Sequence, residues 1–217
     1  PMLEIKVSDG HAGEAPSPFV MQFSQEDLGQ GPMGYTVEDR HLRAVLHNAL
    51  KHSNVTFFPN CEILSQTTHS TNTAVALNSG ITLIASLLVG ADGRNSNVAR
   101  SAGLTRAGWR YDQSSLVCAI AHDKPHNGIA HQYFMPSGPL AILPMTHNRS
   151  GIVWTEKTEI AQQIHTLNDT NYLDIIRSRF GKFLGAISLS GKRYIYPLSL
   201  SHTYRMTPQT LPLVGDS

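Results

Sequence analysis

The sequence predicts a mixed fold of the α/β and α+β classes, with an antiparallel sheet as its larger part. Residues 113–154 contain four short apolar segments separated by turns, and two helical patterns follow them, an order typical of an antiparallel sheet with helices on one face. Earlier in the chain, the apolar residues 87–89 lead into a Gly-Ala-Asp-Gly turn and then a short helical stretch, the order found in α/β sheets. We therefore expect two domains.

The first 34 residues are predicted to contain two strands. Residues 2–7 alternate apolar and polar side chains as a half-buried strand does, and residues 19–23 form the returning strand. Residues 24–34 are polar and rich in glycine, which favours a crossing between domains.

The clearest helix is predicted over about residues 37–51. Thr36, with Asp39 three residues later, resembles a capping box at its start. Apolar side chains recur at helical spacing, so that we expect one face to lie in the core: Leu42, Val45, Leu46, Ala49 and Leu50.

Short strands are expected after this helix. Residues 55–58 and 61–66 are two of them, and residues 73–77 and 81–85 form a hairpin. This meander leads into residues 87–89, whose apolar run we interpret as a further strand.

The second half of the chain is predicted to hold the antiparallel sheet. Its strands are expected at residues 113–122, 130–134, 140–143 and 151–154. Helical spacing follows at residues 160–167 and 173–180, with Gly181 as the C-cap of the second helix. Residues 194–198 form a further strand, which Pro197 limits to an edge or an end of the sheet.

Composition excludes several classes of protein. With 17 basic and 16 acidic side chains among 217 residues, the chain has no excess of charge with which to hold nucleic acid. The two cysteines have neither metal-binding spacing nor the density of a disulfide scaffold, which favours a reduced, cytoplasmic setting and apolar packing for both. No apolar run reaches the roughly 18 to 20 residues that span a bilayer.

Two kinds of active site are also disfavoured. The eleven histidines include no His-Glu-x-x-His pattern, so that we expect no metal site. No Gly-x-Ser-x-Gly elbow of a serine hydrolase is present. The sequence therefore shows no catalytic side-chain constellation.

Four motifs, in the same order, give the chain a specific resemblance. Residues 90–96 (GADGRNS), followed by Arg100 and Gly103, resemble the Asp-Gly motif of the single-component flavin aromatic hydroxylases, the para-hydroxybenzoate hydroxylase-like family. Residues 213–217 (LVGDS) resemble the family's Gly-Asp motif. Between them, residues 138–144 (GPLAILP) and 196–198 (YPL) are similar to the ubiquinone-biosynthesis branch. The resemblance covers roughly residues 34–217.

The chain departs from the family's pattern at both ends. The family opens with a Gly-x-Gly-x-x-Gly turn, whose helix N-terminus holds the FAD pyrophosphate, and no such turn occurs here. The chain begins at Pro1 and stops directly after the Gly-Asp motif. We interpret it as an internal fragment of a longer enzyme, which by itself is expected to be inactive and to bind FAD weakly or not at all.

The resemblance implies a division into domains. An incomplete FAD/NAD(P)-binding domain would comprise residues 34–105, with a return at residues 208–217. An antiparallel β-sheet substrate domain, with helices on one face, would comprise residues 106–207 together with an excursion at residues 1–25.

The resemblance also implies the cofactors and the residues that hold them. FAD would be bound, with NAD(P)H or another electron donor, and the residues that would contact it are Asp92, Gly93, Gly215, Asp216 and Arg40. Asp216 would hold the ribityl chain, whereas Asp92 and Gly93 would lie by the pyrophosphate and also serve the reaction with the nicotinamide. Arg40 is preferred to Asp39 because a cation can pair with pyrophosphate. The alternative is that Arg40 and Asp39 only complete the helix start and face solvent.

Two side chains are candidates to face a phenolic substrate. His131 and Tyr133 lie on one predicted strand, just before a Pro-Ser-Gly-Pro turn. The alternative is that they are ordinary surface or core residues of that strand.

The implied function is hydroxylation of an aromatic ring by a flavin-dependent monooxygenase, through a flavin C4a-hydroperoxide. The substrate would be a polyprenyl phenol intermediate of ubiquinone biosynthesis, and the enzyme would be cytoplasmic, with peripheral membrane contact or a place in a biosynthetic complex. The cofactor carries the chemistry and no side chain need be a nucleophile. Two alternatives stay open: a hydroxylase of a small soluble aromatic with the same fold, and a non-enzymatic binding module that lost its flavin site.

Overall fold

The computed structural model describes residues 1–10, 17, 19–203 and 211–216. The chain forms two compact units, each described here by itself. Unit 1 consists of Pro1–Leu46 and Arg110–Leu198, and unit 2 consists of His47–Trp109 and Ser199–Ser217. The domain boundaries expected from the sequence, and the roles given to the two domains, stay predictions.

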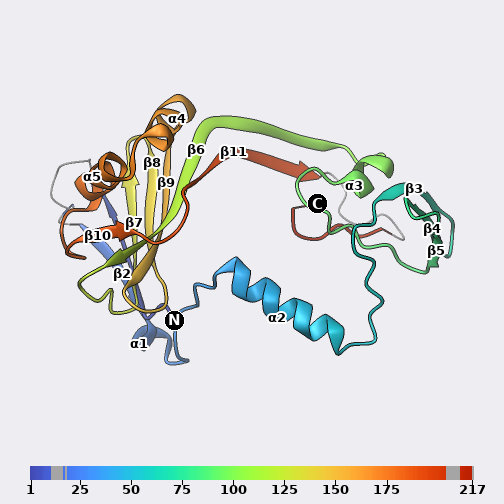
Figure 1. Ribbon diagram of the computed structural model, residues 1–217, viewed down its shortest axis with the longest axis horizontal. Coiled ribbons are helices and arrows are strands. Elements are labelled where there is room, and N and C mark those ends of the chain that lie inside the picture. Colours follow the sequence, from blue (N-terminus) through green and yellow to red (C-terminus); the bar gives the residue numbers. More distant parts are fainter. Residues whose placement is uncertain (11–16, 18, 204–210, 217) are drawn as a thin grey trace. The chain divides into compact units, whose positions relative to one another are not determined.

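Unit 1 is built on one large sheet (Figure 1). Its elements are β1 (Glu4–Asp9), β2 (Val20–Ser24), α1 (Gln25–Leu28), β7 (Ile129–Met135), β8 (Gly138–Pro144), β9 (Arg149–Lys157), α4 (Thr158–Thr166), α5 (Asp169–Phe180) and β10 (Ile187–Leu189). Two long strands, β6 (Arg106–His122) and β11 (Tyr194–Thr203), and the helix α2 (Asp39–Lys51) each continue from one unit into the other.

The strand order is β10-β6-β9-β8-β7-β1-β2, and β11 also pairs with β6. Strands β6, β9, β8 and β7 pair with one another in antiparallel orientation, which confirms the antiparallel sheet predicted for residues 113–154. Strand β1 joins β7 in parallel orientation and pairs with β2 antiparallel, so that the first strands of the chain extend the same sheet.

Helices α4 and α5 cover one face of this sheet, as predicted (Figure 1). The Asn168 side chain caps α5 by accepting a hydrogen bond from the Asn171 N–H at 2.9 Å, and Gly181 ends the helix with a positive φ of 82°. The core lies between the helices and the sheet, where Trp154 of β9 and Tyr172 of α5 are fully buried.

The opposite face of the sheet carries small and apolar side chains. Because neighbouring residues of a strand point to opposite faces, the residues that alternate with the core residues point away from α4 and α5. These residues include Val117, Ala119, Ala141, Leu143 and Val153, all partly exposed. We call this set the open sheet face.

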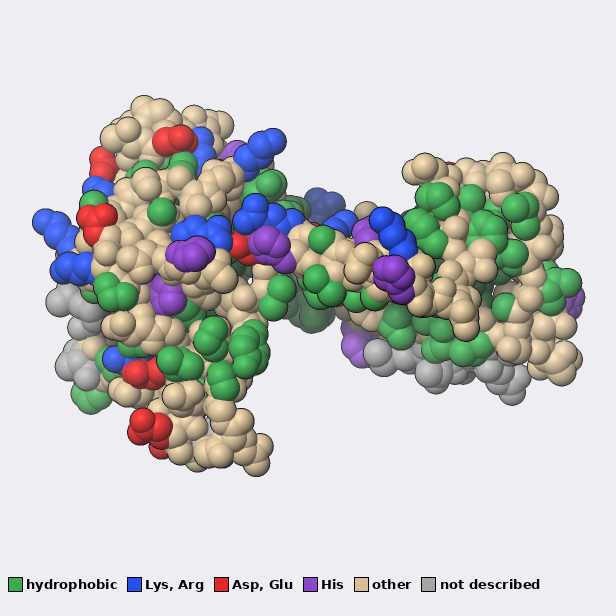
Figure 2. All heavy atoms as spheres, turned by 60° about the horizontal axis from the view of Figure 1, so that its bottom comes forward, with side chains coloured by type: hydrophobic (Ala, Val, Ile, Leu, Met, Phe, Trp, Pro, Cys, Tyr) green, Lys and Arg blue, Asp and Glu red, His purple; other side chains and the backbone are tan. Residues whose placement is uncertain are grey.

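Unit 2 contains a small antiparallel sheet of β3 (Ile63–Thr68), β4 (Thr73–Leu77) and β5 (Thr82–Ala85), together with the short helix α3 (Asn97–Ser101). The predicted hairpin is confirmed by the pairing of β4 with β5. Few apolar side chains are buried here, and the side chains of Leu64 and Ile84 are largely exposed. Figure 2 shows hydrophobic side chains on the surface of this unit.

Two predicted strands are absent. Residues 55–58 and 87–89 have apolar sequences but no regular secondary structure. A strand needs a neighbour for its backbone groups, and in the described part of the chain residues 87–89 lead only to one isolated bridge, at Gly90. The short strand β10 was not expected from the sequence.

Helix α2 forms as predicted, but its apolar stripe is not in a core. None of its residues is buried, and Val45 is 66% exposed. The prediction of a core face was wrong because no described helix or strand packs extensively against this stripe.

Candidate functional site

The Asp92 carboxylate organises the Gly-Ala-Asp-Gly turn and caps helix α3. Its Oδ2 accepts hydrogen bonds from the backbone N–H groups of Asn97 at 2.7 Å and Val98 at 3.1 Å, and its Oδ1 accepts one from the Ser96 hydroxyl. The Ser96 oxygen in turn accepts from the Ala99 N–H at 3.0 Å. These bonds satisfy N–H groups that the first turn of a helix leaves unpaired.

The same bonds fix the charge of Asp92. Partial burial raises the pKa of this carboxyl, but the hydrogen bonds from Ser96, Val98 and Asn97 outweigh it and hold the pKa below its ordinary value. Asp92 is therefore anionic at neutral pH. Next to it, Gly93 takes a positive φ of 80°, which a side chain would strain.

The two glycine-aspartate motifs, more than a hundred residues apart in the chain, meet at Gly90 and Leu213. They form a parallel bridge, in which the Gly90 N–H donates to the Pro212 carbonyl and the Val214 N–H donates to the Gly90 carbonyl, both at 2.9 Å. A Cβ at position 90 would lie 2.6 Å from Leu213 Cδ2, so that a larger residue at position 90 would force the Leu213 side chain to shift. The fold thus brings Asp92 and Gly93 into the same unit as Gly215 and Asp216.

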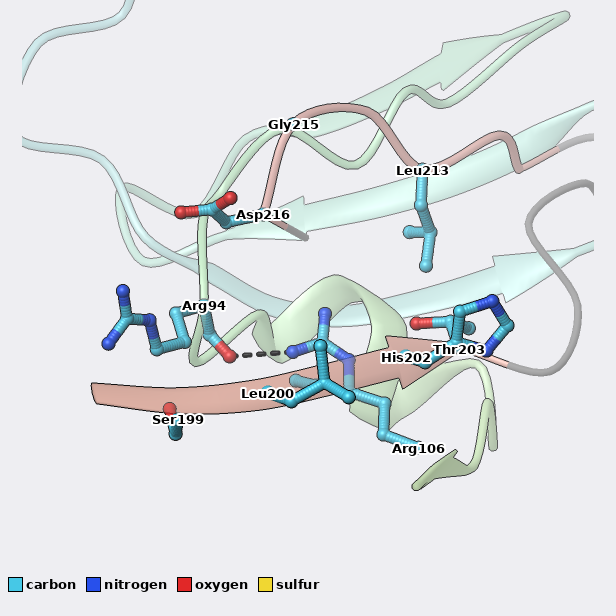
Figure 3. A pocket seen from close by; sticks show the side chains of 10 residues that line it. Arg94, Arg106, Ser199, Leu200, His202, Thr203, Leu213, Gly215 and Asp216 are labelled. Atoms are coloured by element: carbon cyan, nitrogen blue, oxygen red, sulfur yellow. Dashed lines mark hydrogen bonds between the residues drawn. The ribbon is translucent and has the colours of Figure 1, made fainter. Parts of the chain in front are cut away.

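Beside this bridge lies a cleft of about 280 Å³ (Figure 3). Residues 199–203 of β11 form one side, with Asp216 and Arg94 toward one end and His202 and Thr203 toward the other. Arg106 also lines the cleft, and its Nη1 donates to the Arg94 carbonyl at 2.6 Å. The second terminal nitrogen, Nη2, is buried and has no hydrogen-bond partner among the described residues.

Comparison with protein families matches residues 18–217 to a family described as the FAD binding domain. The chain belongs to the FAD binding domain family. Ubiquinone hydroxylase UbiL of Rhodospirillum rubrum is 36% identical over 218 residues, covering 100% of this chain and 49% of the relative. The 3-demethoxyubiquinol 3-hydroxylase of Escherichia coli is 29% identical over 196 residues, 90% of this chain and 50% of that protein. The chain thus spans about half the length of these curated relatives.

The fold is shared with solved structures of flavin enzymes. The crystal structure of p-nitrophenol 4-monooxygenase PnpA from Pseudomonas putida matches with a TM-score of 0.72 over 97% of this chain and 55% of that chain. Because only 14% of residues are identical, this likeness establishes the fold of the FAD binding domain family and nothing finer.

The cleft of unit 2 fits part of an FAD molecule. Arg106 Nη2 is a buried donor without a partner, and a phosphate or hydroxyl oxygen would satisfy it. Gly215, at a φ of 67°, has no heavy atom within 4 Å of where its Cβ would lie, so that a ligand can approach the backbone there. The cleft is small beside the ligand pockets of about 300–1,000 Å³ common in proteins, and would take only part of the dinucleotide.

Arginines that the sequence analysis did not name as candidate site residues dominate this region. Arg94, Arg100 and Arg106 line a second small cleft, of about 240 Å³, together with Ser96 and Asn95. Their position next to the Gly-Ala-Asp-Gly turn was visible in the sequence, but the approach of β11 to residues 94–106 was not. Such a cluster of guanidinium groups suits an anionic ligand.

Arg40 is not in the unit that holds the other predicted flavin residues. It lies in the first turn of α2, in unit 1, with its side chain 66% exposed and its Nη2 at 2.8 Å from Glu38 Oε2. Glu38 also pairs with Arg149 of β9 at 2.7 Å. The hydrogen bond from Arg149 is the main reason that the pKa of Glu38 lies below its usual value. Contact between Arg40 and a flavin stays a prediction.

His131 and Tyr133 line a different cleft, of about 410 Å³, in unit 1. Their rings are stacked with centroids 6.0 Å apart, and His131 lies 4.7 Å from Phe183. Burial, aided by the charge of Lys6, lowers the pKa of His131 to about 4, so that this imidazole is neutral at pH 7. The side chain of Tyr133 belongs to the core cluster, and both side chains therefore point to the helix-covered face, opposite the open sheet face.

Proposed function

We propose that the chain is part of an FAD-dependent monooxygenase that hydroxylates a polyprenylated phenol in ubiquinone biosynthesis. The meeting of the two glycine-aspartate motifs at Gly90 and Leu213 carries the flavin part of the proposal. The substrate part is supported by the relatives, which are named as ubiquinone hydroxylases and match nearly the whole of this chain.

Unit 2 is proposed as part of the flavin-binding domain, for which segments 34–105 and 208–217 are expected; residues 34–46 of these belong to unit 1. Asp216 would accept hydrogen bonds from flavin hydroxyls, and the positive φ of Gly215 lets the backbone approach the cofactor. Arg106 Nη2 would donate to an oxygen of the same ligand. Asp92 and Gly93 would shape the neighbouring turn, where the carboxylate is already fixed by α3.

The electron donor is proposed to be NAD(P)H or another reductant that reaches the flavin. Arg94 and Arg100 are exposed guanidinium groups beside Asp92, and they would attract the phosphates of a nicotinamide nucleotide.

Unit 1 is proposed as the greater part of the substrate domain, which would comprise residues 1–25 and 106–207. The open sheet face offers small side chains such as Ala119 and Ala141 next to larger apolar ones such as Val153. The carbon atoms of a flat aromatic ring and its isoprenoid chain can lie against such an apolar surface, which removes them from water. His131 and Tyr133, on the other face, would then serve another ligand or pack structurally.

Bound FAD would supply the oxygen chemistry. The residues of this chain would bind the cofactor, hold the ring in place and exclude water. No side chain is assigned as a nucleophile or as a general base.

Among the described residues, no helix combines the length and the apolar character needed to cross a membrane. We propose that the enzyme meets its prenylated substrate at the cytoplasmic surface of a membrane or within a biosynthetic complex.

The test is turnover by the full-length protein, with a polyprenylated phenol and a short soluble phenol as competing substrates. The expected result is hydroxylation of the prenylated phenol. Ala141→Asp should abolish this activity while flavin stays bound, and the control Gln162→Asp, on the exposed surface of α4, should keep it. Preference for the short phenol would instead support the small-aromatic hydroxylase. Bound flavin without turnover of either would contradict the proposed enzyme, and no flavin binding at all would favour the non-enzymatic module.

A further inference from the structure

A fourth cleft, of about 360 Å³, lies in unit 1 and shares no residue with the three clefts described above. It lies where α4 ends, α5 begins and the turn after β10 passes. The residues that line it are His165, Asp169, Leu189, Gly191, Lys192 and Arg193.

Two buried nitrogen atoms on different elements of this cleft have no hydrogen-bond partner among the described residues. They are Nη1 of Arg193, after β10, and Nδ1 of His165, in the last turn of α4. A buried polar atom without a partner costs about 1–3 kcal/mol. Because a guanidinium nitrogen can only donate, Arg193 Nη1 indicates a missing acceptor at this cleft.

The guanidinium of Arg193 is held in place by its neighbours. It lies over the ring of Tyr172, 4.7 Å from the centroid, and its side chain is 18% exposed. Its Nη2 is 3.6 Å from Asp169 Oδ1, too long for a good hydrogen bond, and the Asp169 side chain is 71% exposed. Asp169 therefore offsets the charge of Arg193 only in part.

Further positive charge surrounds the cleft. Lys192 is exposed and has no ion-pair partner within the described residues. Helix α5 begins at Asp169, so that the positive end of a 12-residue helix lies at this cleft. The two cations Lys192 and Arg193, set against the one carboxylate of Asp169, leave the lining with a net charge of about +1.

We propose that this cleft binds a phosphate monoester. The Arg193 nitrogen, Lys192 and His165 approach from two separate segments, an arrangement that suits the several oxygens of a tetrahedral anion better than a planar carboxylate. The cleft is larger than a single phosphate, which leaves room for an attached organic group. The phosphate could be that of a free metabolite or that of a lipid headgroup, and the inference does not depend on the proposed hydroxylase activity.

The test measures binding of inorganic phosphate and glycerol 3-phosphate to the full-length protein by calorimetry. Saturable binding is expected, weakened about 10- to 100-fold in Arg193→Gln, because a charge-assisted hydrogen bond is lost. Lys192→Gln, at an exposed position where the fold is not at risk, should weaken binding about 3- to 10-fold. Arg177→Gln on α5, which removes an equal charge away from the cleft, is the control and should bind as the unaltered protein does.

Sedimentation with vesicles distinguishes the two sources of phosphate. Binding to vesicles that contain phosphatidate, competed by glycerol 3-phosphate and absent with phosphatidylcholine alone, would identify a lipid headgroup. Binding of glycerol 3-phosphate without any vesicle binding would identify a free phosphate ester. Two results would overturn the proposal: no saturable binding of either probe, or equal binding by Lys192→Gln, Arg193→Gln and the unaltered protein. The two buried nitrogens would then be hydrated by water.

Discussion

At the scale of single residues, His131 links the stability of unit 1 to pH. Its pKa is about 4 in the folded chain and 6.5 ordinarily, so that between these values the unfolded chain binds more protons. The free energy of unfolding should therefore fall as the pH is lowered from 7 to 4. His131→Gln should reduce this fall, whereas the exposed control His52→Gln should keep it. Chemical denaturation at several pH values measures both, and an unchanged pH dependence in His131→Gln would show that the imidazole is not buried.

Asp92 has a structural role, the capping of α3, beside the flavin role that is expected of it. Asp92→Ala leaves the Asn97 and Val98 N–H groups without their acceptor and should destabilise unit 2 by about 1–2 kcal/mol. If the carboxylate also serves the nicotinamide reaction, flavin reduction in the full-length protein should slow as well. Thermal unfolding and anaerobic stopped-flow reduction separate the two roles: a loss of stability with an unchanged reduction rate would limit Asp92 to capping.

At the scale of elements, a buried ion pair ties α5 to β9. Glu156 Oε1 lies 2.8 Å from Arg179 Nη2 and also accepts hydrogen bonds from the Trp154 indole and the Ser137 hydroxyl. The side chain of Glu156 is only 3% exposed and that of Arg179 15%. Glu156→Gln should therefore lower the free energy of unfolding by about 3–5 kcal/mol, because it leaves the buried guanidinium without a counter-ion. The exposed ion pair of Asp174 with Arg177 is the control: Asp174→Asn should lower the free energy of unfolding by at most about 0.5 kcal/mol. Equal losses of stability in denaturant titrations would contradict the assigned burial.

The bridge between the two motifs is tested at Gly90. A methyl group there would meet Leu213 Cδ2, so that Gly90→Ala should destabilise unit 2 by about 1–3 kcal/mol, and Leu213→Ala in the same chain should recover part of the loss. Gly10→Ala, where a Cβ meets nothing within 4 Å, is the control. Additive effects of the two substitutions in thermal unfolding would show that residues 90 and 213 are not in contact.

The sequence patterns predicted individual helices and strands better than they predicted which segments pair or pack with one another. The alternation in residues 113–154 and the cap at Gly181 gave correct elements, because each depends on residues close together in the chain. The apolar residues 87–89 and the stripe of α2 predicted burial that the structure does not show, since burial depends on which other segment lies opposite. For the same reason Arg106 was missed: its role follows from the approach of β11, which no local pattern encodes.

At the scale of the whole molecule, membership of the FAD binding domain family explains why two distant motifs have to meet. The Gly-Asp segment near the end of the chain supplies residues 211–214 to the turn at Gly90, and Asp216 then lies at the cleft that Arg94 and Arg106 line. No side-chain nucleophile is needed in such an arrangement, which agrees with the absence of a catalytic constellation in the sequence.

The most direct test of this account is the FAD affinity of the full-length protein with and without Asp216, measured by quenching of flavin fluorescence. Asp216→Ala should raise the Kd for FAD about 10- to 100-fold, the loss of one charge-assisted hydrogen bond of about 1.5–3 kcal/mol. Asp174→Ala, which removes an exposed carboxylate in unit 1, should leave the Kd unchanged. An unaltered Kd in Asp216→Ala would contradict the claim that the two motifs meet at the flavin site.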